Sequence, residues 1–137
     1  MNEVLIEGPA DLSKSLGQVR VVSLDKEAGR AAIEYRCGMH MCHSGGVAQG
    51  GFVTGWIDAA MAHATMAATG FDMVPMTLEI KVSFFQPAAP GLVTAEAWIE
   101  RRGRSTVFVE GLLRNAQGDV LAKATSTIRL VPRAKLG

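Results

Sequence analysis

The sequence has 137 residues, of which 48% are hydrophobic and 20% are charged. A chain of this length and composition is expected to form one globular domain with its own core, which excludes an intrinsically disordered protein. The formal net charge of +1 gives no general attraction to nucleic acid.

The N-terminal residues and the cysteine count indicate where the protein is expected to act. The first residues contain no basic region leading into a long apolar run, so no signal peptide is predicted. The two cysteines, Cys37 and Cys42, are too few for a disulfide framework. We therefore expect a reducing, cytoplasmic location.

The chain is predicted to begin with a short lead-in and a β-hairpin. Residues 1–18 form the lead-in, which includes a brief helix that Gly17 ends. Alternating β-branched residues predict strands at Gln18–Leu24 and Arg30–Arg36, and the polar segment Asp25–Gly29 supplies the turn between them.

The segment Cys37–Ala48 is predicted to be a loop rich in His, Met, Cys and Gly. Its first seven residues, Cys37–His43, contain several possible ligands for a soft metal. Zinc sites usually take paired ligands from two separated segments, and no second pair follows. We therefore predict no metal site, and a zinc-binding interaction module is the least favoured function.

One long helix is predicted from Gln49 to Gly70, with Gly50-Gly51 at its start and a glycine stop at its end. The helix is unusually apolar, which predicts burial on most sides rather than a membrane span. Asp58 is the only formal charge between Arg36 and Asp72. A carboxylate in such surroundings needs a partner, a shifted pKa or a function, so Asp58 is the first candidate for chemistry.

Two features of this helix permit two interpretations each. A stripe of small and polar residues could form a ligand slot or a packing surface; it contains Gly51, Gly55, Asp58, Ala62, Thr65 and Thr69. The free N–H groups at the helix start could polarise a carbonyl oxygen, or the Gly50-Gly51 pair could simply form a turn.

Four further strands are predicted after the helix, at Thr77–Phe85, Val93–Glu100, Ser105–Arg114 and Val120–Val131. Their short connections favour antiparallel pairing, so residues 1–137 are expected to form one α+β domain with a curved sheet around one helix. Gly111 is expected to mark a bulge or a close approach. Helix surface left uncovered by the sheet, including Phe52 and Trp56, predicts a homo-oligomer.

Several short motifs along the chain resemble one known family. They are Gln49-Gly50-Gly51, Asp58, the segment 77–88, Gly91, Arg102-Gly103-Arg104 and Ala122-Lys123-Ala124-Thr125. In this order and spacing they resemble the hotdog-fold acyl-coenzyme A thioesterases, most closely the phenylacetate-pathway (PaaI-like) branch, over residues 20–131.

The resemblance implies an antiparallel sheet wrapped around one long central helix. It further implies homodimers with a continuous sheet, which often pair into homotetramers, and active sites at the protomer interfaces. The substrate would be a coenzyme A thioester with an aryl or a short or medium acyl group. No cofactor, nucleic acid or membrane is expected as a partner.

The resemblance also implies roles for single residues. Asp58 would act as nucleophile or as general base, the Gly50 N–H would polarise the thioester carbonyl, and the Thr77 hydroxyl would lie near the attacking water. Two supporting positions differ from this branch, which usually has His at position 49 and often Asn at position 43; here they are Gln49 and His43. The candidate substrate-binding residues are Gly51, Thr54, Arg102 and Arg104, with the arginines as ligands for phosphates.

Those two differences keep two other functions open. The same fold could bind an acyl-coenzyme A or another acyl ligand without hydrolysing it. Hydration or dehydration of an acyl thioester would require a histidine paired with Asp58, which His43 makes conceivable.

Overall fold

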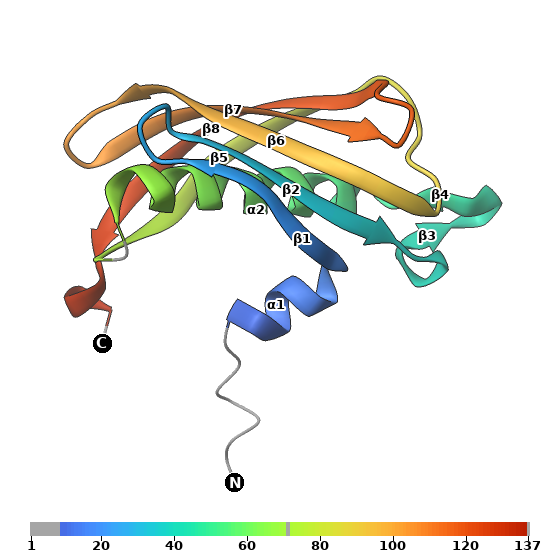
Figure 1. Cartoon of the computed structure of the whole chain (residues 1–137), viewed down its shortest axis with the longest axis horizontal. Coiled ribbons are helices and arrows are strands. Elements are labelled where there is room, and N and C mark those ends of the chain that lie inside the picture. The colour runs from blue at the N-terminus through green and yellow to red at the C-terminus, as the bar shows by residue number, and fades with distance from the viewer. Residues whose placement is uncertain (1–8, 71, 137) are drawn as a thin grey trace, which may run out of the picture.

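The computed structural model describes residues 9–70 and 72–136, and it contains a six-stranded antiparallel sheet curved around one long helix (Figure 1). The strand order in the sheet is β1-β2-β6-β7-β8-β5. The elements are α1 (Pro9–Ser15), β1 (Gln18–Asp25), β2 (Arg30–Cys37), η2 (Met39–Met41), β3 (Cys42–His43), η3 (Ser44–Gly46), β4 (Val47–Ala48), α2 (Gly50–Thr69), β5 (Met73–Phe84), β6 (Gly91–Arg102), β7 (Thr106–Asn115), β8 (Val120–Pro132) and η4 (Arg133–Lys135).

The six long strands confirm the predicted α+β architecture, and two details differ from the sequence-based expectation. β5 begins at Met73, four residues earlier than predicted, and runs through Pro75. Proline is tolerated there because β5 is an edge strand, where one row of N–H groups has no ladder partner. The predicted loop contains a small hairpin, β3–β4, whose two-residue strands are too short to give an alternating pattern.

Helix α2 has the predicted boundaries. Gln49 precedes it with an extended backbone, and Gly70 ends it with a φ of 88° while donating its N–H to the Met66 carbonyl at 2.8 Å. Only the side toward the sheet is fully buried, which corrects the expectation of burial on most sides. Within residues 9–70 and 72–136, no helix has both the length and the apolar character needed to cross a membrane.

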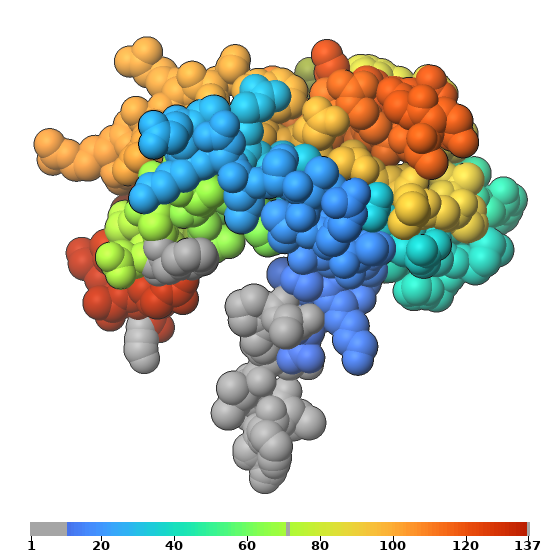
Figure 2. All heavy atoms as spheres, viewed as in Figure 1, coloured from blue at the N-terminus to red at the C-terminus, as the bar shows by residue number. Residues whose placement is uncertain are grey.

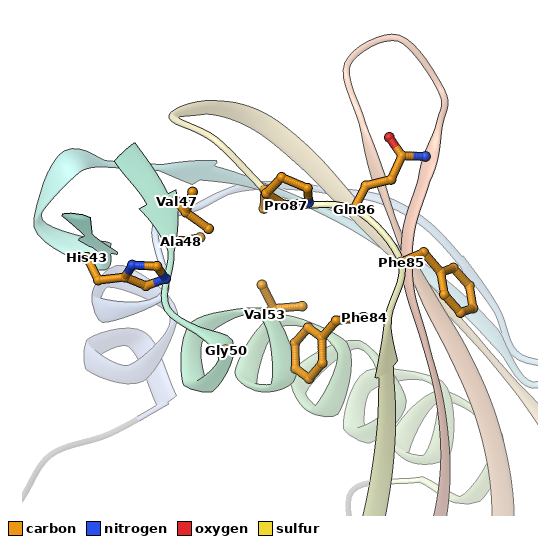
Figure 3. A pocket seen from close by; sticks show the side chains of 10 residues that line it. His43, Val47, Ala48, Gly50, Val53, Phe84, Phe85, Gln86 and Pro87 are labelled. Carbon is orange, nitrogen blue, oxygen red and sulfur yellow. The ribbon is translucent and has the colours of Figure 1, made fainter. Parts of the chain in front are cut away.

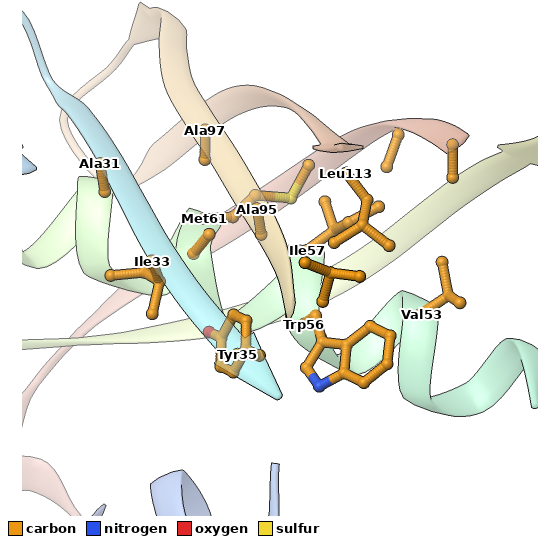
Figure 4. Close-up of a cluster of buried hydrophobic side chains, with 14 of the residues drawn as sticks. Ala31, Ile33, Tyr35, Val53, Trp56, Ile57, Met61, Ala95, Ala97 and Leu113 are labelled. Atoms are coloured by element: carbon orange, nitrogen blue, oxygen red, sulfur yellow. The ribbon is translucent and has the colours of Figure 1, made fainter. Parts of the chain in front are cut away.

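The core lies between α2 and the concave face of the sheet (Figure 4). Ile57 and Met61 of the helix pack there against inward-facing residues of the sheet such as Ile33 and Leu113. A Cβ atom added at Gly111 would lie 2.8 Å from Cγ2 of Ile57, so this glycine marks the predicted close approach of helix and sheet.

Trp56 is fully buried inside the protomer, contrary to the prediction that it contributes uncovered helix surface. Its indole N–H donates to the carbonyl of Leu16 at 2.8 Å, and its ring stacks with that of Tyr35 at 6.1 Å between centroids. A Cβ at Gly55 would lie 3.3 Å from Cδ2 of Leu16. The segment that follows α1 therefore packs against this part of α2, so Gly55 serves packing rather than a ligand slot.

Candidate functional site

Asp58 and Thr77 form a hydrogen-bonded pair where α2 faces the edge strand β5. The Thr77 hydroxyl donates to Oδ1 of Asp58 at 2.8 Å, and Asp58 is half-buried. The lone carboxylate of the helix thus has a partner from a segment 19 residues further along the chain.

A β-bulge aims Thr77 at the helix. The pairing of β5 with β8 shifts between Thr77 and Glu79, because Thr77 is opposite Ile128 whereas Glu79 is opposite Thr127. Ile128 is a buried core residue and Thr127 is not, so Thr77 lies on the inner face of the sheet and Glu79 on the outer face, and both side chains are exposed at the sheet edge. In a regular strand the side chains of Thr77 and Glu79, two residues apart, would point to the same face; the bulge at Leu78 turns them to opposite faces.

The N-terminus of α2 opens onto a cavity of about 380 Å³ between β3–β4 and the end of β5 (Figure 3). Gly50 lies at its floor, and a Cβ at Gly50 would lie 3.4 Å from Cζ of the Phe84 ring. The remaining lining residues are His43, Val47, Ala48, Val53, Phe85, Gln86, Pro87 and Ala88. The mostly apolar lining suits a carbon chain or ring next to the polar helix start.

Gln49 is held at the helix entry by its backbone and lies over the first turn. Its N–H donates to the Met41 carbonyl at 2.9 Å. A Cβ at Gly51 would lie 3.0 Å from the side-chain Oε1 of Gln49, so Gly51 leaves room for this amide. Thr54 is half-buried and follows Gly50 by one turn, and Asp58 follows by two, which puts all three along one side of α2.

The two candidate arginines lie at the other end of the molecule. Figure 2 shows the hairpin between β6 and β7 projecting opposite the segment that contains β3 and β4. Arg102 donates from Nη1 to the carbonyl of Ala68 at 3.2 Å, near the C-terminus of α2. Ala68 is 18 residues after Gly50, which corresponds to about 27 Å along a helix. Arg104 is exposed in the same hairpin.

Seven of the nine predicted site residues therefore form three groups within one chain: Asp58 with Thr77, Gly50 with His43 across the cavity and Gln49 next to it in the chain, and Arg102 with Arg104. Gly51 and Thr54 lie on α2 between Gly50 and Asp58. Asp58 lies eight residues after Gly50, about 12 Å along α2. Sequence reasoning did not assign Phe84 and Val53 to the cavity. The sequence does contain one signal for the Phe84 side of this cavity. In the run Phe84-Phe85-Gln86-Pro87, two aromatic residues precede a proline that ends the strand, which places them at an edge where a pocket can form.

Neither a metal site nor a pairing of His63 with Asp58 is formed in the described part of the chain. His63 pairs through Nδ1 with the carbonyl of Ala59 at 2.8 Å rather than with Asp58. Among residues 9–70 and 72–136, no three His, Cys, Asp or Glu side chains are grouped so that they could hold a metal ion.

Comparisons of the sequence and of the structure with known proteins agree on one family. The model of the thioesterase superfamily matches residues 45–122. A provisionally named esterase of Saccharolobus solfataricus is 32% identical over 106 residues, which span 77% of this chain and 74% of the relative.

Solved structures show the same arrangement of helix and sheet. A protein of Ralstonia eutropha JMP134, provisionally named a thioesterase and related to phenylacetic acid degradation, is 32% identical, covers 92% of each chain and has a TM-score of 0.83. A Streptococcus mutans UA159 protein bound to acetyl coenzyme A shares the fold at 19% identity, with 82% of this chain and 87% of that chain covered and a TM-score of 0.74.

These matches confirm the hotdog fold and the resemblance to the phenylacetate-pathway branch. The matched family model spans more than half of the chain and includes Gly50, Asp58 and Thr77. The chain therefore belongs to the thioesterase superfamily and is a thioester hydrolase.

Proposed function

We propose that the protein hydrolyses coenzyme A thioesters with an aryl or a short or medium acyl group. The observation that carries this proposal is the 2.8 Å hydrogen bond between Thr77 and Asp58, which sets a carboxylate and a hydroxyl side by side at an open sheet edge. The acetyl coenzyme A bound by a protein of the same fold supports this choice of substrate. The cytoplasmic location stays a prediction.

In the proposed reaction, Asp58 accepts a proton from a water molecule that attacks the thioester carbonyl, or attacks that carbonyl itself. Thr77 orients Asp58 and the water through its hydroxyl. The N–H of Gly50 donates to the carbonyl oxygen as negative charge develops on it. The carbon–sulfur bond then breaks and the thiol leaves with a proton. Where water attacked, the carboxylic acid is formed directly; where Asp58 attacked, water then hydrolyses the acyl–Asp58 anhydride, which releases the acid and restores the carboxylate.

One chain cannot supply both halves of this site. The oxyanion donor and the attacking group must each lie about 3 Å from the reacting carbonyl. The N–H of Gly50 and the carboxylate of Asp58 are separated by about 12 Å of helix. We therefore infer that Asp58 of one protomer acts with Gly50 of a second copy.

The edge strand β5 is the proposed contact between the two copies. It has 12 residues, and its exposed apolar side chains include Leu78, which is 60% exposed. A long apolar edge strand is a template for pairing with another strand. A two-fold axis at the level of Thr54, midway between Gly50 and Asp58, would bring the two site halves together.

The charges on β5 suit such a pairing. If two antiparallel β5 strands meet at Ile80, then Glu79 of each copy lies opposite Lys81 of the other, on the same face of the sheet. A homodimer is thus the proposed minimal active unit. Pairing of dimers into a homotetramer stays a prediction.

The arginine hairpin is proposed to bind the phosphates of coenzyme A. Ala68, whose carbonyl holds Arg102, lies ten residues beyond Asp58, about 15 Å along α2. The extended pantetheine arm of coenzyme A can span that length. Arg102 and Arg104 would then bind the phosphates while the thioester lies at Asp58 of the same chain.

The test of the proposed function is release of free thiol from a panel of aryl, short and medium acyl-coenzyme A esters. Catalysed release from one or more esters is expected, and the relative kcat/KM values would rank the acyl groups. Saturable binding of these esters without release would favour the non-catalytic acyl-ligand module, for which the unusual Gln49 and His43 are the motivation. Consumption of enoyl-coenzyme A with retention of the thioester would indicate a hydratase instead.

The Gly50 N–H can be removed without disturbing the helix. Proline is favoured at the first helical position, and the extended backbone of Gln49 suits a following proline. We expect Gly50→Pro to lower kcat by about 10²–10³-fold, the usual cost of losing an oxyanion donor. Gly50→Ala retains the N–H and places its methyl group at van der Waals distance from Phe84, so it should keep most of the activity. Equal activity of both variants would exclude the proposed role.

The two-chain site predicts complementation between inactive variants. Unfolding and refolding an equal mixture of Gly50→Pro and Asp58→Asn chains should yield mixed dimers with one intact site. Random pairing would recover about a quarter of the wild-type activity. Each variant refolded alone is the control, and no recovery in a mixture shown to contain mixed dimers would contradict the inference.

Thr77 is expected to contribute through its hydroxyl alone. Thr77→Val has nearly the same shape but cannot donate to Asp58, and we expect kcat to fall by roughly 10–100-fold, the equivalent of one hydrogen bond to a charged group. Thr77→Ser retains the hydroxyl and should stay within a few-fold of wild type. If the serine variant loses as much activity as the valine variant, packing of the methyl group is what matters.

A further inference from the structure

We propose that Cys37 and Cys42 form a thiol–disulfide site, which low-molecular-weight disulfides oxidise and whose oxidation alters the entry of α2. Sγ of Cys37 lies 3.9 Å from Sγ of Cys42. Both thiols also lie near one acceptor, the carbonyl oxygen of Gly38, at 3.9 and 3.6 Å. The two sulfur atoms thus already face each other inside the protein.

The local chain path suits an intramolecular bond. Cys37 ends β2 and Cys42 begins β3, and the four residues between them contain η2. A disulfide has a sulfur–sulfur distance of about 2.05 Å, so the two atoms must approach each other by roughly 2 Å. Side-chain rotation and a small shift of the short segment Gly38–Met41 can supply this movement, because no long element has to be displaced.

The two thiols differ in solvent exposure, and this difference decides which of them reacts first with an external disulfide. Cys42 is half-buried, whereas Cys37 is only 2% exposed. Burial, and secondarily the hydrogen bond and charge of Cys42, raise the pKa of the Cys37 thiol to about 11. Cys42 therefore attacks first, and the proximity of Cys37 compensates for its small thiolate fraction in the second step.

The oxidant in the proposed reaction is a low-molecular-weight disulfide of the glutathione type. The Cys42 thiolate attacks one sulfur of the disulfide, its sulfur–sulfur bond breaks, and one thiol leaves. Cys37 then loses its proton and attacks Sγ of Cys42 in the mixed disulfide, which releases the second thiol. The protein dithiol is oxidised by two electrons, and the small disulfide is reduced to two thiols.

This site is linked to the helix entry by one hydrogen bond. Met41 precedes Cys42, is buried, and accepts the N–H of Gln49 at 2.9 Å. His43, which lines the cavity at Gly50, directly follows Cys42. A shift of Cys42 toward Cys37 therefore displaces Met41 and His43, and through the Gln49 hydrogen bond it displaces the N-terminus of α2.

The consequence for activity rests on the proposed function. If Gly50 donates to the thioester carbonyl, a displacement of about 1 Å can cost up to 10²-fold in rate. We expect the oxidised protein to turn over acyl-coenzyme A roughly 10–100 times more slowly than the reduced protein, and dithiothreitol to restore the rate.

The experiment incubates the full chain in buffers of set reduced-to-oxidised glutathione ratio and determines its thiol state by intact mass and peptide mapping. The expected product is a single polypeptide, not covalently joined to another, that has lost two hydrogen atoms and contains a disulfide between Cys37 and Cys42. A stable glutathione adduct on Cys42, a cross-link between chains, or two free thiols at every ratio would each overturn the proposal.

Variants separate this inference from the proposed function. Cys42→Ser should keep the activity of the reduced wild type and should lose the response to oxidised glutathione. Cys37→Ala should retain a glutathione adduct on Cys42 as its end product. If the cross-link forms in a protein that hydrolyses none of the acyl-coenzyme A esters, the thiol site stands and the proposed coenzyme A substrates are overturned. If a fully cross-linked protein turns over at the normal rate, the proposed coupling between oxidation and activity is overturned.

Discussion

Replacement of Asp58 by Asn is expected to lower kcat for acyl-coenzyme A hydrolysis by about 10²–10⁴-fold, the range attributed to a positioned acid–base group. Asparagine has almost the same size as aspartate, and its side-chain oxygen can still accept the Thr77 hydroxyl hydrogen bond, which is 2.8 Å long in the wild type. It cannot accept a proton from water or form an acyl intermediate. The loss should therefore appear in thiol release and not in folding.

The control for this variant is substrate binding. Asp58→Asn should bind acyl-coenzyme A with a Kd close to the wild-type KM and should have an unchanged unfolding midpoint. Asp58→Glu, which restores a carboxylate one methylene further out, should regain part of the activity. Retention of full turnover in Asp58→Asn would remove Asp58 from the chemistry and leave it as a helix residue that holds β5.

Replacement of Trp56 by Ala is expected to destabilise the protein by about 3–5 kcal/mol, the usual cost of emptying a core site of this size. The side chain is fully buried, contacts Tyr35 and Phe52, and holds the Leu16 carbonyl at 2.8 Å. Its loss removes the hydrogen bond that ties α2 to the segment after α1. Chemical denaturation at one protein concentration measures the change, because oligomerisation makes stability depend on concentration.

Trp56→Phe is the matched control. It keeps an aromatic ring in the core but loses the indole N–H, so the cost should be about 1–2 kcal/mol. A change of less than about 1 kcal/mol in Trp56→Ala would contradict the burial of this residue. Destabilisation of both variants to the same extent would assign the effect to the Leu16 hydrogen bond.

Much of the fold could be predicted from the sequence because its signals are local. The alternation of Leu78, Ile80, Val82 and Phe84 identifies a strand without reference to any partner, and Gly70 ends α2 because its φ of 88° is accessible to glycine. Elements without a local signal cannot be predicted in this way. Strands β3 and β4 have only two residues each, which is too short for an alternating pattern. Pro75 is a residue that usually interrupts a strand, so the sequence predicts a later start for β5 than Met73.

Residue faces were harder to predict than element boundaries. The bulge at Leu78 reverses the face of Thr77 relative to Glu79, and a strict period of two cannot anticipate such a reversal. Similarly, Gly55 lies against Leu16 rather than against the sheet, and Trp56 contacts both Tyr35 of the sheet and the Leu16 carbonyl. A helix pattern alone does not reveal which segment fills its exposed side.

The sequence by itself determined the element order, the single long helix with its glycine boundaries, and the isolation of Asp58 as the one charge on that helix. These properties depend on neighbouring residues and on helical or strand periodicity. The tertiary structure decided that Thr77 hydrogen-bonds Asp58, that the Gly50 cavity and the arginine hairpin lie at opposite ends of α2, and that Cys37 faces Cys42. Such contacts depend on how sheet curvature, a bulge and chain crossings bring distant residues together, and no local pattern encodes those distances.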